Sequence, residues 1–130
     1  MLSIVIGLFG MIGAVARYYL SAIPLWDDSI FPIGTLCCNL FGCFLLGWFN
    51  QVIKASKNVH PYIKTGIETG MIGSFTTFST FSIESVQLFM SHKIALGILY
   101  ILTSFVGGWF LVWVGDRTGR TMRKIERGEV

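Results

Sequence analysis

Charged side chains are scarce in this sequence: they make up 13% of its 130 residues, and the first along the chain is Arg17. Hydrophobic residues make up 53%. A water-soluble domain of this size buries only roughly 65% of its unfolded surface, which is too little to cover so much apolar side chain. The scarcity of charge therefore excludes an ordinary soluble domain and predicts a protein whose solvent is lipid.

Residues for metal binding and catalysis are equally sparse. The three cysteines, Cys37, Cys38 and Cys43, lack the C-x2-C spacing of a zinc site. Cys37 and Cys38 point to different faces of a helix, so no disulfide is implied. Both histidines, His60 and His92, fall at predicted loops, and no Ser-His-Asp or Cys-His arrangement stands out. We predict that the protein is not an enzyme.

Long polar segments are missing as well. Four apolar stretches fill most of the chain, at about 2–23, 31–53, 61–90 and 94–114. A helix crosses the ~30 Å hydrocarbon core of a bilayer in about 20 residues, and each stretch is long enough. The sequence predicts an all-α, multi-pass membrane protein with four transmembrane helices in a single domain, residues 1–130. No basic residue precedes the first stretch, so we expect it to remain in the mature protein.

Basic residues concentrate on one side of this predicted topology. Four spans place both termini and the loop at 51–60 on the same side, which carries Lys54, Lys57, Lys64, Arg117, Arg120, Arg123, Lys124 and Arg127. The opposite side has only Arg17 and Lys93. The positive-inside rule then predicts both termini in the cytoplasm. The net charge of +3 reports this orientation, and we do not predict nucleic-acid binding.

The first apolar stretch carries small residues on one helical face. Gly10, Gly13, Ala14 and Arg17 follow the i, i+3, i+4, i+7 spacing of such a face. Small residues let another helix backbone approach closely in a membrane. Arg17 either snorkels to the interface or has a functional or structural role with ions.

The second stretch also has a helical face with small residues, and this face carries an amide side chain. Thr35, Asn39, Gly42 and Cys43 share one face. An amide inside an apolar span must find a partner or lose several kcal/mol. Asn39 offers two N–H donors, which suit either a plain interhelical hydrogen bond or an ion.

The third stretch is the least lipid-like of the four. Between Gly70 and Ser82, glycine and hydroxyl residues alternate densely with three phenylalanines. Glycine, clustered threonine and competing hydroxyls weaken a helix, so we predict a break near 73–77. Within a membrane, such breaks are tolerated only where the freed backbone groups face protein, water or an ion. The break is therefore the expected place for a binding site.

Two phenylalanines follow the predicted break. Phe78 and Phe81 are three residues apart and share a helical face. The edge of an aromatic ring is positive, so two edges pointing into a cavity could contact a small, dehydrated anion. Ser79, Thr80 and Ser82 could extend the path as hydrogen-bond donors. On spacing alone, ordinary packing of the two rings remains open.

Three strings together resemble the Fluc (CrcB) family of small dual-topology fluoride channels. They are Gly10-x2-Gly13-Ala14-x2-Arg17-Tyr18, Gly34-Thr35-Leu36-x2-Asn39-x2-Gly42-x-Phe44-x2-Gly47, and Gly70-x2-Gly73-x2-Thr76-Thr77-Phe78-Ser79-Thr80-Phe81-Ser82. The resemblance covers the whole chain. It implies an antiparallel dimer of four-helix subunits with two pores, which exports fluoride passively across the bacterial plasma membrane.

The resemblance also implies roles for individual residues. The implied fluoride pathway consists of Asn39 as amide donor, Phe78 and Phe81 as ring edges, Ser79 and Thr80 as a polar track, and Arg17 as an attractor of anions or a brace of the vestibule. The backbone carbonyls of Gly73 and Thr76 would hold a structural sodium ion at the dimer centre. Two small departures, Ser74 and Cys43 where glycine and serine are expected, do not threaten the fold.

The charge bias leaves the composition of the dimer open. A subunit that inserts in both orientations needs balanced loops, whereas this chain strongly favours one orientation. An antiparallel homodimer and a heterodimer with an oppositely biased sister subunit are both compatible with the sequence. The alternative class is a small multidrug exporter coupled to protons, which usually needs a membrane-embedded carboxylate. Glu68 and Glu84, which flank the predicted break, are the carboxylates available for it.

Overall fold

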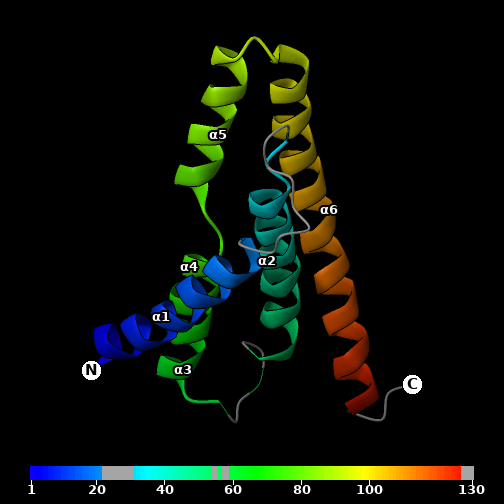
Figure 1. Ribbon diagram of the computed structural model, residues 1–130. Helices are drawn as coiled ribbons and strands as arrows, with labels where there is room; N and C mark the ends of the chain where they lie inside the picture. Colours follow the sequence, from blue (N-terminus) through cyan, green and yellow to red (C-terminus); the bar gives the residue numbers. More distant parts are fainter. Residues whose placement is uncertain (22–30, 54–55, 57–58, 127–130) are drawn as a thin grey trace.

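The computed structural model describes residues 1–21, 31–53, 56 and 59–126, and every regular element in them is a helix. In chain order these are α1 (Leu2–Ser21), α2 (Ile33–Val52), α3 (Pro61–Thr65), the π-helix η1 (Gly66–Ile72), α4 (Gly73–Phe75), α5 (Phe78–Met90) and α6 (Ile94–Glu126). α6 runs the full height of the molecule, with α2 beside one part of it and α5 beside another, while α1 crosses obliquely (Figure 1). The predicted all-helical class is confirmed for the described residues.

Within the part of the chain that the structure describes, three helices are long and apolar enough to cross a membrane: α1, α2 and α6. Their bounds differ in detail from the predicted stretches. The end of the first stretch, residues 22 and 23, lies outside the described residues. α2 begins after Pro32, which occupies its N-cap position and has no N–H to donate.

α6 is longer than the sequence predicted, because it continues from 114 to Glu126. Hydropathy marks only its apolar part. The residues that follow include good helix formers, such as Arg117, Met122 and Lys124, and no proline, so the helix can continue where the apolar run ends. Thr118 and Thr121 bond their hydroxyls back to the carbonyls one turn earlier.

Close backbone packing joins α2 to α6. A Cβ atom added to Gly47 of α2 would collide with the Val112 carbonyl oxygen of α6. A Cβ added to Gly115 of α6 would collide in the same way with the Phe44 carbonyl of α2. Because both glycines are buried, the two backbones meet directly, which is the usual packing of small residues between membrane helices.

The glycine face of α1 packs against the segment before the helix interruption. Gly13 lies against the Met71 carbonyl and the Ser74 side chain, and no room remains for a Cβ there. The Ser74 hydroxyl donates to the Gly10 carbonyl at 2.7 Å and to the Met71 carbonyl at 3.2 Å. The close approach predicted from the glycine spacing is confirmed, and it fixes α1 to η1 and α4.

The segment from Pro61 to Met90 changes geometry twice. Residues Gly66–Ile72 form a π-helix, which the sequence did not predict. Gly73 lies inside helix α4, so the non-helical part is narrower than the predicted break and is limited to two residues. Thr76 (φ −83°, ψ 154°) and Thr77 (φ −143°, ψ 121°) are extended, and α5 begins immediately after them.

Candidate functional site at Thr76 and Thr77

The interruption is held by a side chain from another helix. Asn39 of α2 donates its amide to the Thr77 carbonyl at 3.0 Å, and its own carbonyl accepts from the Thr77 N–H at 2.8 Å. An amide side chain thus takes the place of a missing peptide partner and satisfies both backbone groups of Thr77. Such groups are costly when buried without partners. Asn39 keeps a second N–H that is not needed for this pair.

Thr77 also starts the next helix. Its hydroxyl accepts a hydrogen bond from the Thr80 N–H at 3.2 Å, which caps the N-terminus of α5. The same hydroxyl donates to the Thr80 hydroxyl at 3.0 Å and lies 3.3 Å from that of Ser79. The three hydroxyls form one cluster at the first turn of α5.

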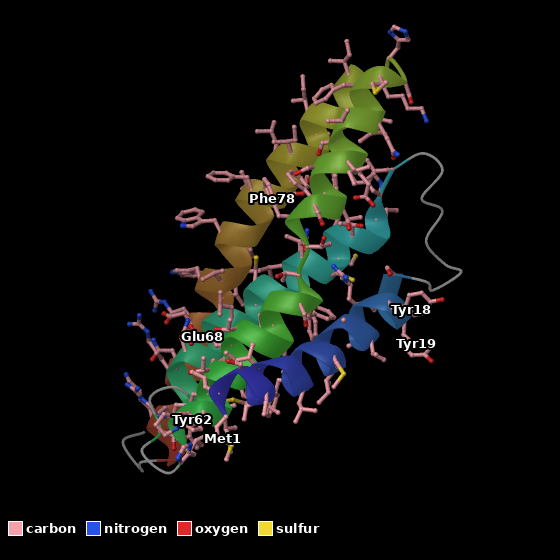
Figure 2. All side chains as sticks on the ribbon, turned by 90° about the vertical axis from the view of Figure 1, so that its left-hand side faces the viewer. Met1, Tyr18, Tyr19, Tyr62, Glu68 and Phe78 are labelled. Carbon is pink, nitrogen blue, oxygen red and sulfur yellow. The ribbon has the colours of Figure 1, made fainter. Side chains whose placement is uncertain are left out.

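A cavity of about 540 Å³ opens beside the interruption. It brings together five of the eight predicted site residues, which are Asn39, Gly73, Thr76, Phe78 and Phe81. Glu68 of η1 also lines it, and in Figure 2 Glu68 lies toward the end that carries Met1 and Tyr62, with Phe78 farther along the molecule. The cavity is therefore lined by an amide, by aromatic rings and by residues of the helix interruption, all from one chain.

The two phenylalanines differ in their surroundings. Phe78 is 80% exposed, whereas Phe81 is half-buried and packs against Tyr100 of α6 with 5.1 Å between ring centroids. The Phe78 and Phe81 rings are 6.0 Å apart and tilted by 38°. Phe81 is thus fixed by its neighbours, while Phe78 presents a largely free ring to the cavity.

A smaller pocket of about 220 Å³ is also lined by Thr77, and it contains two more of the predicted residues, Arg17 and Thr80. Its remaining lining comes from Tyr18, Ser21, Thr35, Cys38 and Thr77. Arg17 makes no hydrogen bond or ion pair with any residue that the structure describes. Its guanidinium therefore supplies positive charge to this pocket. Thr77 borders both spaces.

Ser79 is the predicted residue that lines neither cavity. It is exposed, and its recorded side-chain contact is with the Thr77 hydroxyl. The Thr76 carbonyl receives no hydrogen bond from the part of the chain that is described, so its oxygen is available to a ligand. Gly73, one helical turn earlier, is exposed on the same cavity.

Sequence reasoning missed a polar group that ties three helices together. The Glu84 carboxylate accepts from the Thr35 hydroxyl at 2.7 Å and from the Tyr100 hydroxyl at 2.7 Å. From the sequence, Glu84 was identified only as a carboxylate that flanks the break and would be available to the alternative exporter class. No spacing rule links it to residues on α2 and α6, although a carboxylate in an apolar span does by itself call for nearby donors.

Comparisons with known proteins agree on one family. The family described as CrcB-like protein, Camphor Resistance (CrcB), matches residues 4–116. A protein of Bacillus cereus named fluoride-specific ion channel FluC 1 is 44% identical over 119 residues, which is 89% of this chain and 85% of that protein. A Geobacillus kaustophilus protein named fluoride-specific ion channel FluC 2 is 38% identical over 125 residues, 95% of this chain and 97% of the other. A Listeria monocytogenes protein of the same name is 39% identical over 125 residues, covering 95% and 93%. This chain belongs to the CrcB-like family.

Proposed function

We propose that this protein is a fluoride-selective ion channel in the bacterial plasma membrane and that it lets fluoride leave the cell passively. The observation that carries the proposal is the cavity at the helix interruption, where Asn39, Phe78 and Phe81 meet. It occurs in a chain that is 38–44% identical to bacterial proteins named as fluoride-specific channels. The protein is a multi-pass membrane protein and not an enzyme.

The finer architecture is part of the proposal. Besides the three helices long enough to cross a membrane, residues 61–90 make a fourth crossing in two halves that meet at Thr76 and Thr77. Non-helical backbone at membrane depth is tolerated where protein or an aqueous cavity satisfies it. Asn39 satisfies Thr77 in this way, and the cavity borders Thr76. The whole chain then forms one four-span domain.

Fluoride is small and strongly hydrated, so the pathway must replace its water without holding it too tightly to leave. Arg17 draws the anion to the smaller pocket, where the Thr80 hydroxyl offers a first donor. Thr77 lines both this pocket and the larger cavity. In the larger cavity, the second N–H of Asn39 and the ring edges of Phe78 and Phe81 then contact the anion in place of water. Ser79, which belongs to the hydroxyl cluster, completes the polar track.

Sodium fits the same site as a structural ion. Hard cations prefer oxygen ligands, and the carbonyls of Gly73 and Thr76 belong to residues that line the open cavity. The Thr76 oxygen is not used by any described donor. One chain supplies few such oxygens, so we propose that the site is completed by a second subunit in an antiparallel dimer. Sodium would then add fixed positive charge at the centre of the dimer.

The dimer is either homomeric or composed of this chain and a sister subunit. The basic residues of this chain favour one orientation, which supports the heteromeric form. The largely exposed Phe78 ring and the open cavity beside it support a partner subunit in either case.

The decisive experiment is fluoride efflux from liposomes that contain only this purified chain, followed with a fluoride electrode and repeated with chloride. We expect rapid efflux of fluoride and little of chloride. Phe81→Ile removes a ring edge while keeping an apolar side chain of helix-compatible size, so it should abolish efflux. Phe110→Ile is the matched control, because Phe110 lies on α6 outside both cavities.

Equal loss in the two phenylalanine variants would argue against the pathway. No efflux from correctly folded protein would overturn the homodimeric form. In that case, restoration of efflux by co-reconstitution with a subunit of opposite charge bias would establish the heterodimer.

A further inference from the structure

The outward face of α6 carries one line of exposed side chains. These side chains are apolar in the first part of the line and basic in the last part. Steps of three and four residues place these on one helical face: Leu99, Leu102, Val106, Phe110, Trp113, Arg117, Arg120 and Lys124. All eight are exposed, the first five being 49–55% accessible. We call the last three, Arg117, Arg120 and Lys124, the basic stripe.

This line faces away from the rest of the subunit. Gly108, Gly115 and Gly119 of α6 are buried, and the backbone and side chains of α2 pack against them. The cavity lies along another edge of α6, which is marked by Ile101, Ser104 and Phe105. Neither α2 nor an occupant of the cavity therefore covers the line.

The point where the line turns basic coincides with the expected edge of the hydrocarbon core. Residues 94–114 rise about 31 Å along the helix axis, which matches the ~30 Å core. Arg117 follows within one turn, so it sits at the depth of the lipid phosphates. Its guanidinium lies 5.2 Å from the centre of the Trp113 ring, and tryptophan itself favours this interface.

We infer that the basic stripe of α6 binds the headgroups of anionic phospholipids in the leaflet where the C-terminal part of α6 leaves the hydrocarbon core. The apolar part of the line contacts lipid tails, and because the same face continues without interruption, its basic part meets the headgroups of those lipids. Positive guanidinium and ammonium groups complement a phosphate, and Arg can donate two parallel hydrogen bonds to it. This inference rests on α6 crossing the membrane and not on which ion the protein conducts.

One contact within the stripe shapes the site. Asp116 pairs with Arg120 at 2.7 Å and accepts from the Gln51 amide at 2.5 Å. Asp116 therefore orients Arg120 from the side of α2, and the Arg120 side chain still remains 60% exposed. Neither Lys124 nor Arg117 forms an ion pair with an acidic residue that the structure describes, although the charge of Arg117 also acts on Asp116.

The test measures lipid selectivity of the full chain in phosphatidylcholine vesicles. Spin-labelled phosphatidylglycerol and spin-labelled phosphatidylcholine are added separately, and their association with the protein is compared. We expect a preference for phosphatidylglycerol that reaches roughly fivefold for each cation in contact with the headgroup layer. The triple variant Arg117→Gln, Arg120→Gln, Lys124→Gln should bring the ratio close to one, and about 1 M salt should weaken the wild-type preference.

The matched control is Arg123→Gln, which removes one cation from the same turns but off the stripe. A double variant, Arg117→Lys with Arg120→Lys, should retain most of the preference, because charge is kept. Circular dichroism and gel filtration establish that each variant is folded. Equal association of the two lipids with the wild-type protein, or a loss in Arg123→Gln as large as in the triple variant, would overturn the inference and leave the stripe as a water-solvated face.

Discussion

At the scale of single residues, Asn39, the proposed donor to fluoride, already has a structural partner. Two of its three hydrogen-bonding groups are engaged with Thr77, one as donor and one as acceptor. Only its remaining N–H is left for an ion. A plain interhelical hydrogen bond and an ion ligand, which were alternatives from the sequence, are thus compatible in one side chain.

Asn39→Ala should therefore destabilise the protein as well as stop conduction. The change leaves the N–H and the carbonyl of Thr77 without partners, at a cost of about 2 to 4 kcal/mol. The measurement is thermal unfolding in detergent micelles together with fluoride efflux. Asn50→Ala serves as the control because Asn50 is exposed on the same helix, and it should change stability by no more than about 0.5 kcal/mol. A variant Asn39→Ala with wild-type stability would show that the pair with Thr77 contributes nothing.

The sequence could indicate which residues matter near the interruption but not how they pair. The dense run of hydroxyls and glycines drew attention to residues 70–82, and Asn39 stood out as an amide in an apolar span. The partner of Asn39 is a backbone group, which carries no signature in a sequence. The partners of Glu84 were hidden for a different reason: its donors are the side chains of Thr35 and Tyr100, which come from two other helices.

At the scale of elements, the contact of α2 with α6 depends on glycine. Gly47→Ala should destabilise the protein by about 1 to 3 kcal/mol, because the new methyl group collides with a backbone carbonyl that cannot turn aside. Gly7→Ala is the control: a Cβ there meets nothing within 4 Å, so the substitution should be neutral or stabilise α1 by up to about 1 kcal/mol. Thermal unfolding in micelles measures both. Similar effects at the two glycines would mean that helix propensity, and not packing, governs the result.

Beyond the apolar part of α6, a pH-dependent contact joins the C-terminal end of α2 to α6. The hydrogen bond from Gln51, with further help from Arg120, lowers the pKa of Asp116 below its ordinary value. A carboxyl group whose folded pKa is lowered contributes stability above its unfolded pKa of about 3.9, and this contribution is lost as the pH falls through the lowered value. We expect the difference in unfolding temperature between the wild type and Asp116→Asn to shrink below about pH 4. A difference that stays constant from pH 7 to pH 3 would contradict this.

The length of an element could be predicted from the sequence only where it is set by the thickness of the hydrocarbon core. The apolar stretch at 94–114 marks the crossing part of α6, yet the helix continues to Glu126 because nothing in the sequence stops it. The π-helix at Gly66–Ile72 gave no signal in advance. Its two glycines, Gly66 and Gly70, lie against α1 so closely that a Cβ would collide there. This contact joins segments that are far apart in the sequence, so local sequence patterns do not reveal it.

At the scale of the whole molecule, the basic residues predict the orientation of the chain. In a Cys-free background, Thr121→Cys should be protected in intact cells from a maleimide that cannot cross the membrane, because the C-terminal end of α6 is expected in the cytoplasm. Lys93→Cys, at the opposite end of α6, should react. Comparable reaction at both positions in the same cells would show dual insertion and favour the homodimer over the heterodimer.

The unbroken length of α6 sets the spacing of the residues around the interruption. α2, which carries Asn39, and α5, which carries Phe81, both pack against this one helix. The position of α2 relative to α5 therefore depends on their contacts with α6, and not only on the two extended residues between α4 and α5. One residue inserted into α6 between Tyr100 and Gly115 would shift the two contact regions by about 1.5 Å and rotate them by about 100°. Such an insertion would separate the Asn39 amide from the edge of the Phe81 ring, so we expect the register of α6 to determine the spacing of the proposed pathway.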